Sequence, residues 1–79
     1  MLTVTQVQPF KDYLLQIELS NGKKGLFDVT PYLDKGVFTE LKDRDYFKKV
    51  KIFFCGISWP HNQDFSADTI EYELIEKYS

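Results

Sequence analysis

Residues 55–64 hold the densest group of side chains that could do chemistry. Cys55, Ser58, His61 and Asp64 fall within these ten residues, and together they offer a nucleophile, a base and a carboxylate that could orient the base. Working triads are brought together by the fold, so residue types in one short stretch are a weak signal. We therefore expect no enzyme activity. A small enzyme or ligand-binding domain using the region Cys55–Asp64 stands as the alternative.

The same part of the chain supplies a candidate functional surface, which comprises Trp59, His61, Asp64 and Asp68. A metal held by His61, Asp64 and Asp68 would have one imidazole and two carboxylates in a turn, which is a poor site. One cysteine and one histidine cannot form a zinc motif. The four glycines stand apart, at positions 22, 25, 36 and 56, so no glycine-rich phosphate loop exists. We expect no metal and no cofactor.

Residues 40–51 carry five basic side chains, namely Lys42, Arg44, Lys48, Lys49 and Lys51. Three acidic residues dilute this block, and its last three lysines do not share one helical stripe. Phe53 and Phe54 could stack on bases, but alternation along a strand turns one of two neighbours inward. The formal net charge is −2 and the pI is about 5.2. We expect no nucleic-acid binding by this domain alone.

Residues 64–78 form an opposite, acidic block of five carboxylates against one lysine. Complementary blocks suit docking to a partner or to a second copy, although ordinary solvated faces carry similar charges. We expect a protein partner or self-association, through a strand edge or the last helix.

Length and composition predict a single domain over residues 1–79. The chain is 43% hydrophobic and 16% aromatic, which is enough for a small core. A single cysteine, Cys55, forms no intramolecular disulfide and favours a reducing compartment. No continuous apolar run resembles a signal peptide or a membrane span. We expect a cytoplasmic protein without membrane association.

Hydrophobic patterning predicts an α+β fold, with a small, mostly antiparallel sheet of about five strands and two or three short helices on one face. The expected strands are Leu2–Gln8, Tyr13–Leu19, Lys24–Asp28, Val50–Phe54 and Ile57–Trp59. Asn21-Gly22 predicts a hairpin between the second and third. A two-residue turn would place Ile17 opposite Leu26, and a three-residue loop with a glycine bulge would shift the pairing by one residue.

Three sites predict helix starts. Thr30 ahead of Pro31 suits a short helical turn, Asp43 suits the N-cap of a second helix, and Ser66 suits that of the last helix. The last helix has an apolar stripe and an ion pair, formed by Ala67, Ile70, Leu74 and Tyr78 and by Glu73 and Lys77. Six side chains are expected to be mostly buried, namely Leu15, Ile17, Leu26, Phe47, Ile70 and Leu74. Replacing Leu74 by alanine would then cost about 2–4 kcal/mol.

Taken together, several segments resemble the bacterial family known as domain of unknown function 2442. They run almost end to end, and include Ser20-Asn21-Gly22-Lys23, Gly25-Leu26-Phe27-Asp28-Val29, Gly36-Val37-Phe38-Thr39-Glu40-Leu41, Asp45-Tyr46-Phe47 and Ile57-Ser58-Trp59-Pro60. Any one of these segments alone would be unspecific.

The resemblance implies a compact α+β domain, often standing alone and sometimes fused to a DNA-binding helix-turn-helix. Members of the family are often found beside a second small protein, an arrangement similar to toxin–antitoxin pairs, and the resemblance assigns no catalytic residue. This chain has no room for a helix-turn-helix, so we expect no DNA binding in cis. We expect a bacterial, non-enzymatic protein-interaction module, in its finer form the antitoxin-like half of a two-protein pair.

Overall fold

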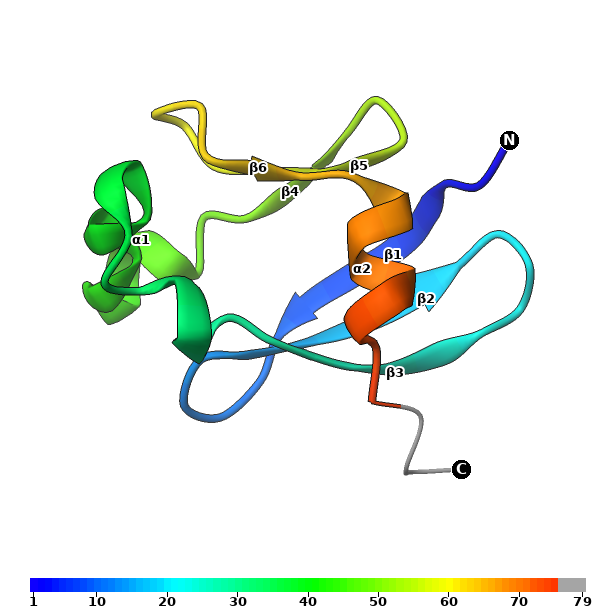
Figure 1. The fold of residues 1–79 in the computed structure, drawn as a ribbon, viewed down its shortest axis with the longest axis horizontal. Helices are drawn as coiled ribbons and strands as arrows, with labels where there is room; N and C mark the ends of the chain where they lie inside the picture. Colours follow the sequence, from blue (N-terminus) through cyan, green and yellow to red (C-terminus); the bar gives the residue numbers. More distant parts are fainter. Residues whose placement is uncertain (76–79) are drawn as a thin grey trace.

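The computed structural model describes residues 1–75, in which six strands form two antiparallel three-stranded sheets (Figure 1). Sheet A contains, in spatial order, β1 (Val4–Pro9), β2 (Leu14–Leu19) and β3 (Lys24–Asp28). Sheet B contains β4 (Lys51–Phe53), β5 (Gly56–Ser58) and β6 (Asp64–Phe65). The helical segments are the 3-10 helices η1 (Thr30–Tyr32) and η2 (Gly36–Lys42) and the α-helices α1 (Arg44–Phe47) and α2 (Ala67–Glu73). The predicted α+β class is confirmed, with the strands divided between two small sheets.

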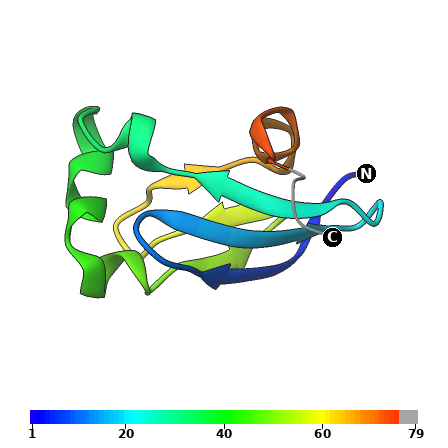
Figure 2. The same ribbon diagram turned by 90° about the horizontal axis from the view of Figure 1, so that it is seen from below.

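The two sheets pack on each other, with sheet B above sheet A in Figure 1. The helical segments occupy two places. η1, η2 and α1 gather at one end of the sheets, whereas α2 lies along their side and contacts β3 and β5 (Figure 2). The backbone N–H of Val4 donates to the carbonyl of Cys55 at 2.8 Å, which joins β1 to the β4–β5 turn. Within the described residues, no helix has the length and apolarity that a membrane span requires.

The β2–β3 hairpin has the three-residue loop, so its pairing is shifted by one from the two-residue alternative. Gly22 has φ +90°, and the N–H of Leu19 donates to the carbonyl of Lys23 at 2.9 Å. Ile17 therefore lies opposite Gly25, and Leu26 lies opposite Gln16. The shift turns Leu26 away from the core face, so the predicted pairing of Leu26 with Ile17 is wrong, and its predicted burial is confirmed only in part. Leu26 is half-buried and bridges Ile75 through two backbone hydrogen bonds.

Gly25 is required by the close approach of the segment that follows α2. A Cβ atom at this position would lie 2.4 Å from the carbonyl oxygen of Ile75 and 3.0 Å from Cγ of Leu74. We expect Gly25→Ala to lower the free energy of unfolding by about 1–3 kcal/mol, because backbone must move to admit the methyl group. Thermal unfolding measures this, with Lys24→Ala on the exposed neighbour as the control. Equal melting temperatures for the two variants would show that Ile75 does not pack on β3.

The core lies between the sheets and is closed by helical residues. Leu15, Ile17, Phe47 and Ile70 are all at most 2% exposed, so their predicted burial is confirmed. Phe65 lies at the centre of an aromatic cluster, whose other rings are those of Phe27, Tyr32, Phe38 and Trp59.

Both predicted side-chain N-caps of α-helices are confirmed. Asp43 accepts from the N–H groups of Asp45 and Tyr46, and Ser66 accepts from that of Thr69. α2 ends at Glu73, so Leu74 is its C-cap and is only half-buried. Leu74 packs against the core, so its predicted burial is confirmed in part, and its replacement by alanine should cost less than that of a fully buried leucine. Lys77 and Tyr78 lie outside the described residues.

η1 confirms the predicted short helical turn at Thr30 and Pro31, but Thr30 is its first residue and not its cap, because Val29 occupies the N-cap position. Its first residue is fixed from outside the helix, because the N–H of Thr30 donates to the carboxylate of Asp28 at 2.9 Å. The hydroxyl of Tyr32 donates to the Glu73 carboxylate, which ties η1 to the end of α2. This hydrogen bond, together with partial burial, raises the pKa of Tyr32 to about 12.

Candidate functional site

The structure places the four residues of the expected functional surface on different segments, although Trp59 and Asp64 line a common hollow. Trp59 belongs to the core, where it is 1% exposed and its indole N–H donates to the carbonyl of Phe47 at 2.9 Å. His61 lies in the exposed turn between β5 and β6. Asp64 is an exposed residue of β6, and Asp68 is an exposed residue in the first turn of α2.

The residues that could have formed a nucleophilic site have separate partners. The thiol of Cys55 contacts the sulfur of Met1 at 3.1 Å, and the hydroxyl of Ser58 lies 3.3 Å from the carbonyl of Trp59. His61 pairs with Glu40. Within residues 1–75, no cluster of three histidine, cysteine or carboxylate side chains could hold a metal. The geometry therefore does not join a nucleophile to a base in this region.

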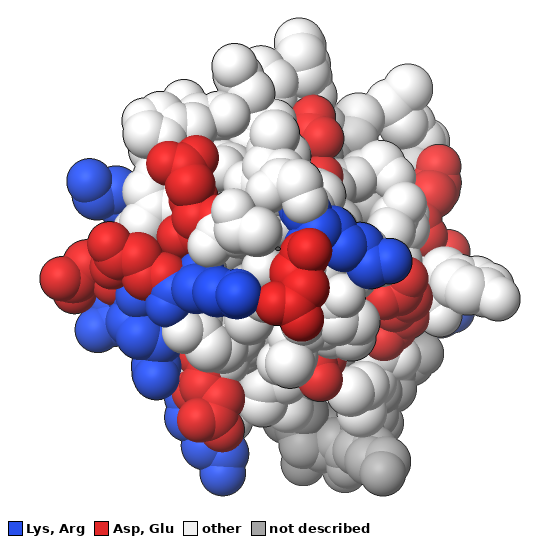
Figure 3. All heavy atoms as spheres, turned by 60° about the vertical axis from the view of Figure 1, so that its left-hand side comes forward, with Lys and Arg blue, Asp and Glu red and all other residues white. Residues whose placement is uncertain are grey.

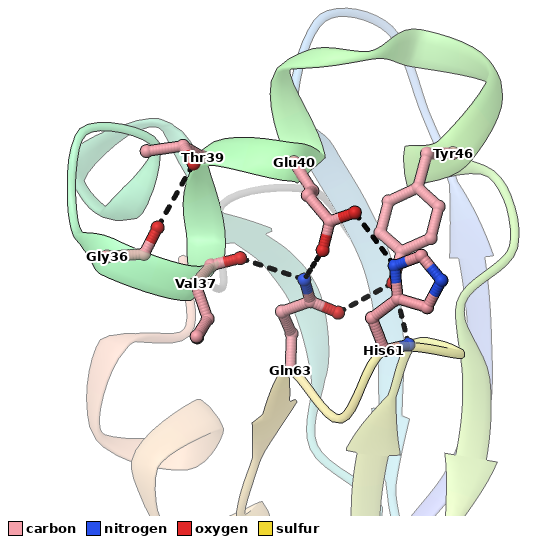
Figure 4. Close-up of polar contacts among 7 residues, drawn as sticks. All are labelled: Gly36, Val37, Thr39, Glu40, Tyr46, His61 and Gln63. Carbon is pink, nitrogen blue, oxygen red and sulfur yellow. Dashed lines mark hydrogen bonds and ion pairs between the residues drawn. The ribbon is translucent and has the colours of Figure 1, made fainter.

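A buried glutamine, Gln63, organises the polar side chains that the structure does bring together (Figure 4). It is 1% exposed, and its side-chain amide donates to the carbonyl of Val37 and to Glu40, each at 2.8 Å. Its side-chain oxygen accepts from the hydroxyl of Tyr46 at 2.7 Å. That hydroxyl accepts in turn from the backbone N–H of His61 at 2.8 Å. Each polar atom of the Gln63 side chain thus has a partner, as burial demands.

This Gln63 network joins η2 and α1 to the turn between β5 and β6. Glu40 completes it, because its second carboxylate oxygen lies 2.7 Å from Nδ1 of His61. The hydrogen bond to His61 is the largest effect on the pKa of Glu40 and lowers it, and the Gln63 amide lowers it further. Both partners are largely exposed, so solvent screens the pair. The network positions a turn and has the character of a structural clamp.

Because the pKa of Glu40 is lowered in the folded protein, part of the free energy of unfolding depends on pH in the acidic range. A carboxyl group whose pKa is lower in the folded state stabilises the fold above its unfolded pKa and loses this effect as pH falls through the folded value. We expect a component of unfolding stability to decrease as pH falls below 4.5, the ordinary value for Glu40. Glu40→Gln should remove that component in urea titrations over this range. Glu18→Gln is the control, since that carboxylate has no side-chain partner in residues 1–75. Identical pH profiles for the wild type and Glu40→Gln would contradict this assignment.

A second feature, the outer face of sheet B, is more open to other molecules. The register places Lys51, Ser58 and Asp64 in one row across β4, β5 and β6, and places Phe53 beside Gly56 in the next row. Ile57 and Phe65, which alternate with these residues, point into the core. We call the set Lys51, Phe53, Gly56, Ser58 and Asp64 the Phe53 face. Lys51, Phe53 and Asp64 are exposed, whereas Gly56 and Ser58 of the central strand are buried between them.

Phe53 and Phe54 are both exposed, at 47% and 87%. Their rings pack on each other with centroids 4.5 Å apart. The expectation that one of them faces inward was wrong, because strand alternation ends at Phe53. Phe54 begins the two-residue β4–β5 turn and has φ +52°, a conformation that is rare for a bulky residue. The end of strand alternation at Phe53 and this backbone conformation of Phe54 leave both rings at the surface.

Hollows flank Phe53 on both sides. One is lined by Phe53, Phe54, Gly56 and Asp64, and extends to Ser66 beyond the end of β6. The other, smaller one is lined by Lys51, Phe53, Ser58, Asp64 and by the turn residues Pro60 and Asn62. The Gln63 network holds this turn in place through Gln63 and His61, so the buried clamp shapes one wall of the exposed face.

Figure 3 shows few charged side chains in its upper part, at the height of sheet B in Figure 1, whereas basic and acidic groups alternate over the lower left. No continuous basic area appears in this view. Lys51 and Asp64, both on the Phe53 face, have no ion-pair partner in the described part of the chain.

Sequence comparison accounts for nearly the whole chain. A family model described as a protein of unknown function, DUF2442, matches residues 4–76. Neither a curated protein nor a solved structure matches the chain. The matched residues span the strands of both sheets, the Gln63 network and the Phe53 face. The chain therefore belongs to the DUF2442 family.

Proposed function

We propose that this protein is a non-enzymatic protein-interaction module of the bacterial cytoplasm, and that it binds through the Phe53 face. The observation that carries the proposal is the pair of exposed phenylalanines, Phe53 and Phe54, whose rings lie side by side at the surface. Exposure of two adjacent aromatic rings to water is energetically unfavourable. Exposed apolar patches of this kind are typical of protein-binding surfaces.

The surroundings of the pair support this proposal. Large aromatic rings beside hollows are the usual anchors of protein interfaces, because a partner can bury them from several sides. Lys51 and Asp64 provide charged groups at the rim that can orient a partner without being desolvated at the centre. The dispersed partners of Cys55, Ser58 and His61 favour binding over catalysis in the region 55–64.

In its finer form, the proposal makes the chain the antitoxin-like half of a two-protein pair. A complex purified from the native host would then contain a second small protein in a fixed ratio to the chain. The interaction-module proposal itself requires only that the retained protein depends on the Phe53 face.

Affinity purification from the native host tests the proposal with three baits. The wild-type chain is compared with the double variant Phe53→Ala/Phe54→Ala and with Tyr72→Ala, which removes an aromatic ring that is 89% exposed on α2. We expect the wild type and Tyr72→Ala to retain the same stoichiometric protein, and the double variant to lose it. The same proteins on all three baits, or none on the wild type, would count against the proposal.

A further inference from the structure

We propose that the occupant of the Phe53 face is a second copy of this chain, docked about a two-fold axis that runs along β5. This inference rests on the proposed function and deepens it by naming the partner. A two-fold interface uses the same patch on both copies, so the patch must be complementary to itself. The layout of sheet B meets that condition in both shape and charge.

The shape condition is met because the hollow that borders the protruding Phe53 extends across β5 to the far side of the sheet. Phe53 projects from β4, and Phe54 follows it in the turn. The hollow beside these rings extends across β5 to Ser66, and the backbone of Phe65 and Ser66 packs against Gly56 within it. A rotation about β5 therefore carries the phenylalanines of one copy over the Ser66 side of the other.

The charge condition is met in the neighbouring row. Lys51 on β4 and Asp64 on β6 flank Ser58 on β5, because Ser58 pairs with both. The same rotation places Lys51 of each copy opposite Asp64 of the other copy, so two ion pairs form across one interface. Neither side chain has an ion-pair partner within residues 1–75, which leaves both available. Ser58 lies on the axis, between the two ion pairs.

A mixing experiment tests the two-fold geometry directly. Lys51→Glu makes the row wholly acidic and Asp64→Lys makes it wholly basic, so each variant alone should repel its own copies. In a one-to-one mixture, both rows meet a row of opposite charge. Sedimentation velocity on the full chain at micromolar concentration should show a dimer for the wild type, monomers for each single variant, and a dimer for the mixture. We expect about a tenfold weaker dimer for each single variant.

Phenylalanine variants test the apolar part of the interface. Phe54→Ala should weaken the dimer by about tenfold or more, and Tyr72→Ala should leave it unchanged. All four substituted side chains are exposed, and circular dichroism melts establish that each variant is folded. The proposal is overturned by a wild-type dimer that Phe54→Ala leaves intact, or by a mixture of charge variants that stays monomeric.

A wild-type chain that is strictly monomeric at all concentrations also overturns the second-copy proposal. The purification from the native host then distinguishes the interaction-module proposal from the second-copy proposal. If a different protein is retained in a Phe53-dependent and Phe54-dependent manner, the interaction module stands and only the identity of its partner is wrong. If nothing is retained, both fail.

Discussion

Replacing Phe65 by alanine is expected to remove nearly all of the stability of this protein. Phe65 is 5% exposed, and its ring stacks on that of Phe38 at 5.0 Å and meets those of Phe27 and Tyr32 edge-on at 4.9 Å. Such a truncation costs about 3–5 kcal/mol, and a domain of this size has about that much in total. Its position explains the effect, since the ring joins β6 to β3 and to both 3-10 helices.

Urea unfolding followed by tryptophan fluorescence measures this loss, because the reporter Trp59 contacts the same cluster at a ring distance of 6.0 Å. Phe10→Ala is the matched control, since that ring is 41% exposed, and we expect a cost well under half as large. Similar unfolding midpoints for the two variants would show that Phe65 is not central to the core.

Replacing Gln63 by leucine is expected to cost about 2–3 kcal/mol, although leucine has a similar volume and greater hydrophobicity. The substitution removes the hydrogen bonds to Val37, Glu40 and Tyr46 and leaves their polar atoms without their buried partner. The turn between β5 and β6 should loosen as well, because the Tyr46 hydroxyl also holds the backbone of His61.

Thermal unfolding and amide hydrogen exchange measure the two effects separately. The melting temperature reports the loss of stability, and exchange of the His61 amide reports opening of the turn. Gln8→Leu makes the same substitution at an exposed position of β1 and should change neither. A Gln63→Leu variant as stable as the wild type would mean that the Gln63 network contributes no net stability.

Local signals in the sequence were sufficient for most elements of the fold. Asp43 and Ser66 are followed by helices because their side chains satisfy free N–H groups, and this depends only on near neighbours. The β2–β3 hairpin follows from Asn21-Gly22 in the same way, but its register depended on whether Gly22 alone or both residues adopt a positive φ. That choice decided which face Leu26 occupies.

Structural features that depend on residues far apart in the chain could not be predicted from the sequence. Two sheets form where one was expected, because β1–β3 and β4–β6 pair only within their own groups. β6 itself was missed because it pairs with β5 over only two residues and carries no pattern of its own. Gln63 resembled an ordinary turn residue, and its role depends on Val37 and Glu40, which lie 26 and 23 residues away. The apolar pattern predicts that Phe54 is the last residue of the strand Val50–Phe54. Its positive φ instead places it in the turn after β4, at the surface.

Hydroxyl-radical footprinting of Phe53 and Phe54 tests the central claim, that the Phe53 face binds protein, most directly. Both rings should be oxidised readily in the dilute, isolated chain and protected in the complex purified from the native host. Tyr72, which is 89% exposed on α2, serves as the internal reference within the same molecule. The account predicts that oxidation of both phenylalanines falls in the complex while that of Tyr72 does not. Equal oxidation of Phe53 and Phe54 in the isolated chain and in the complex would contradict it.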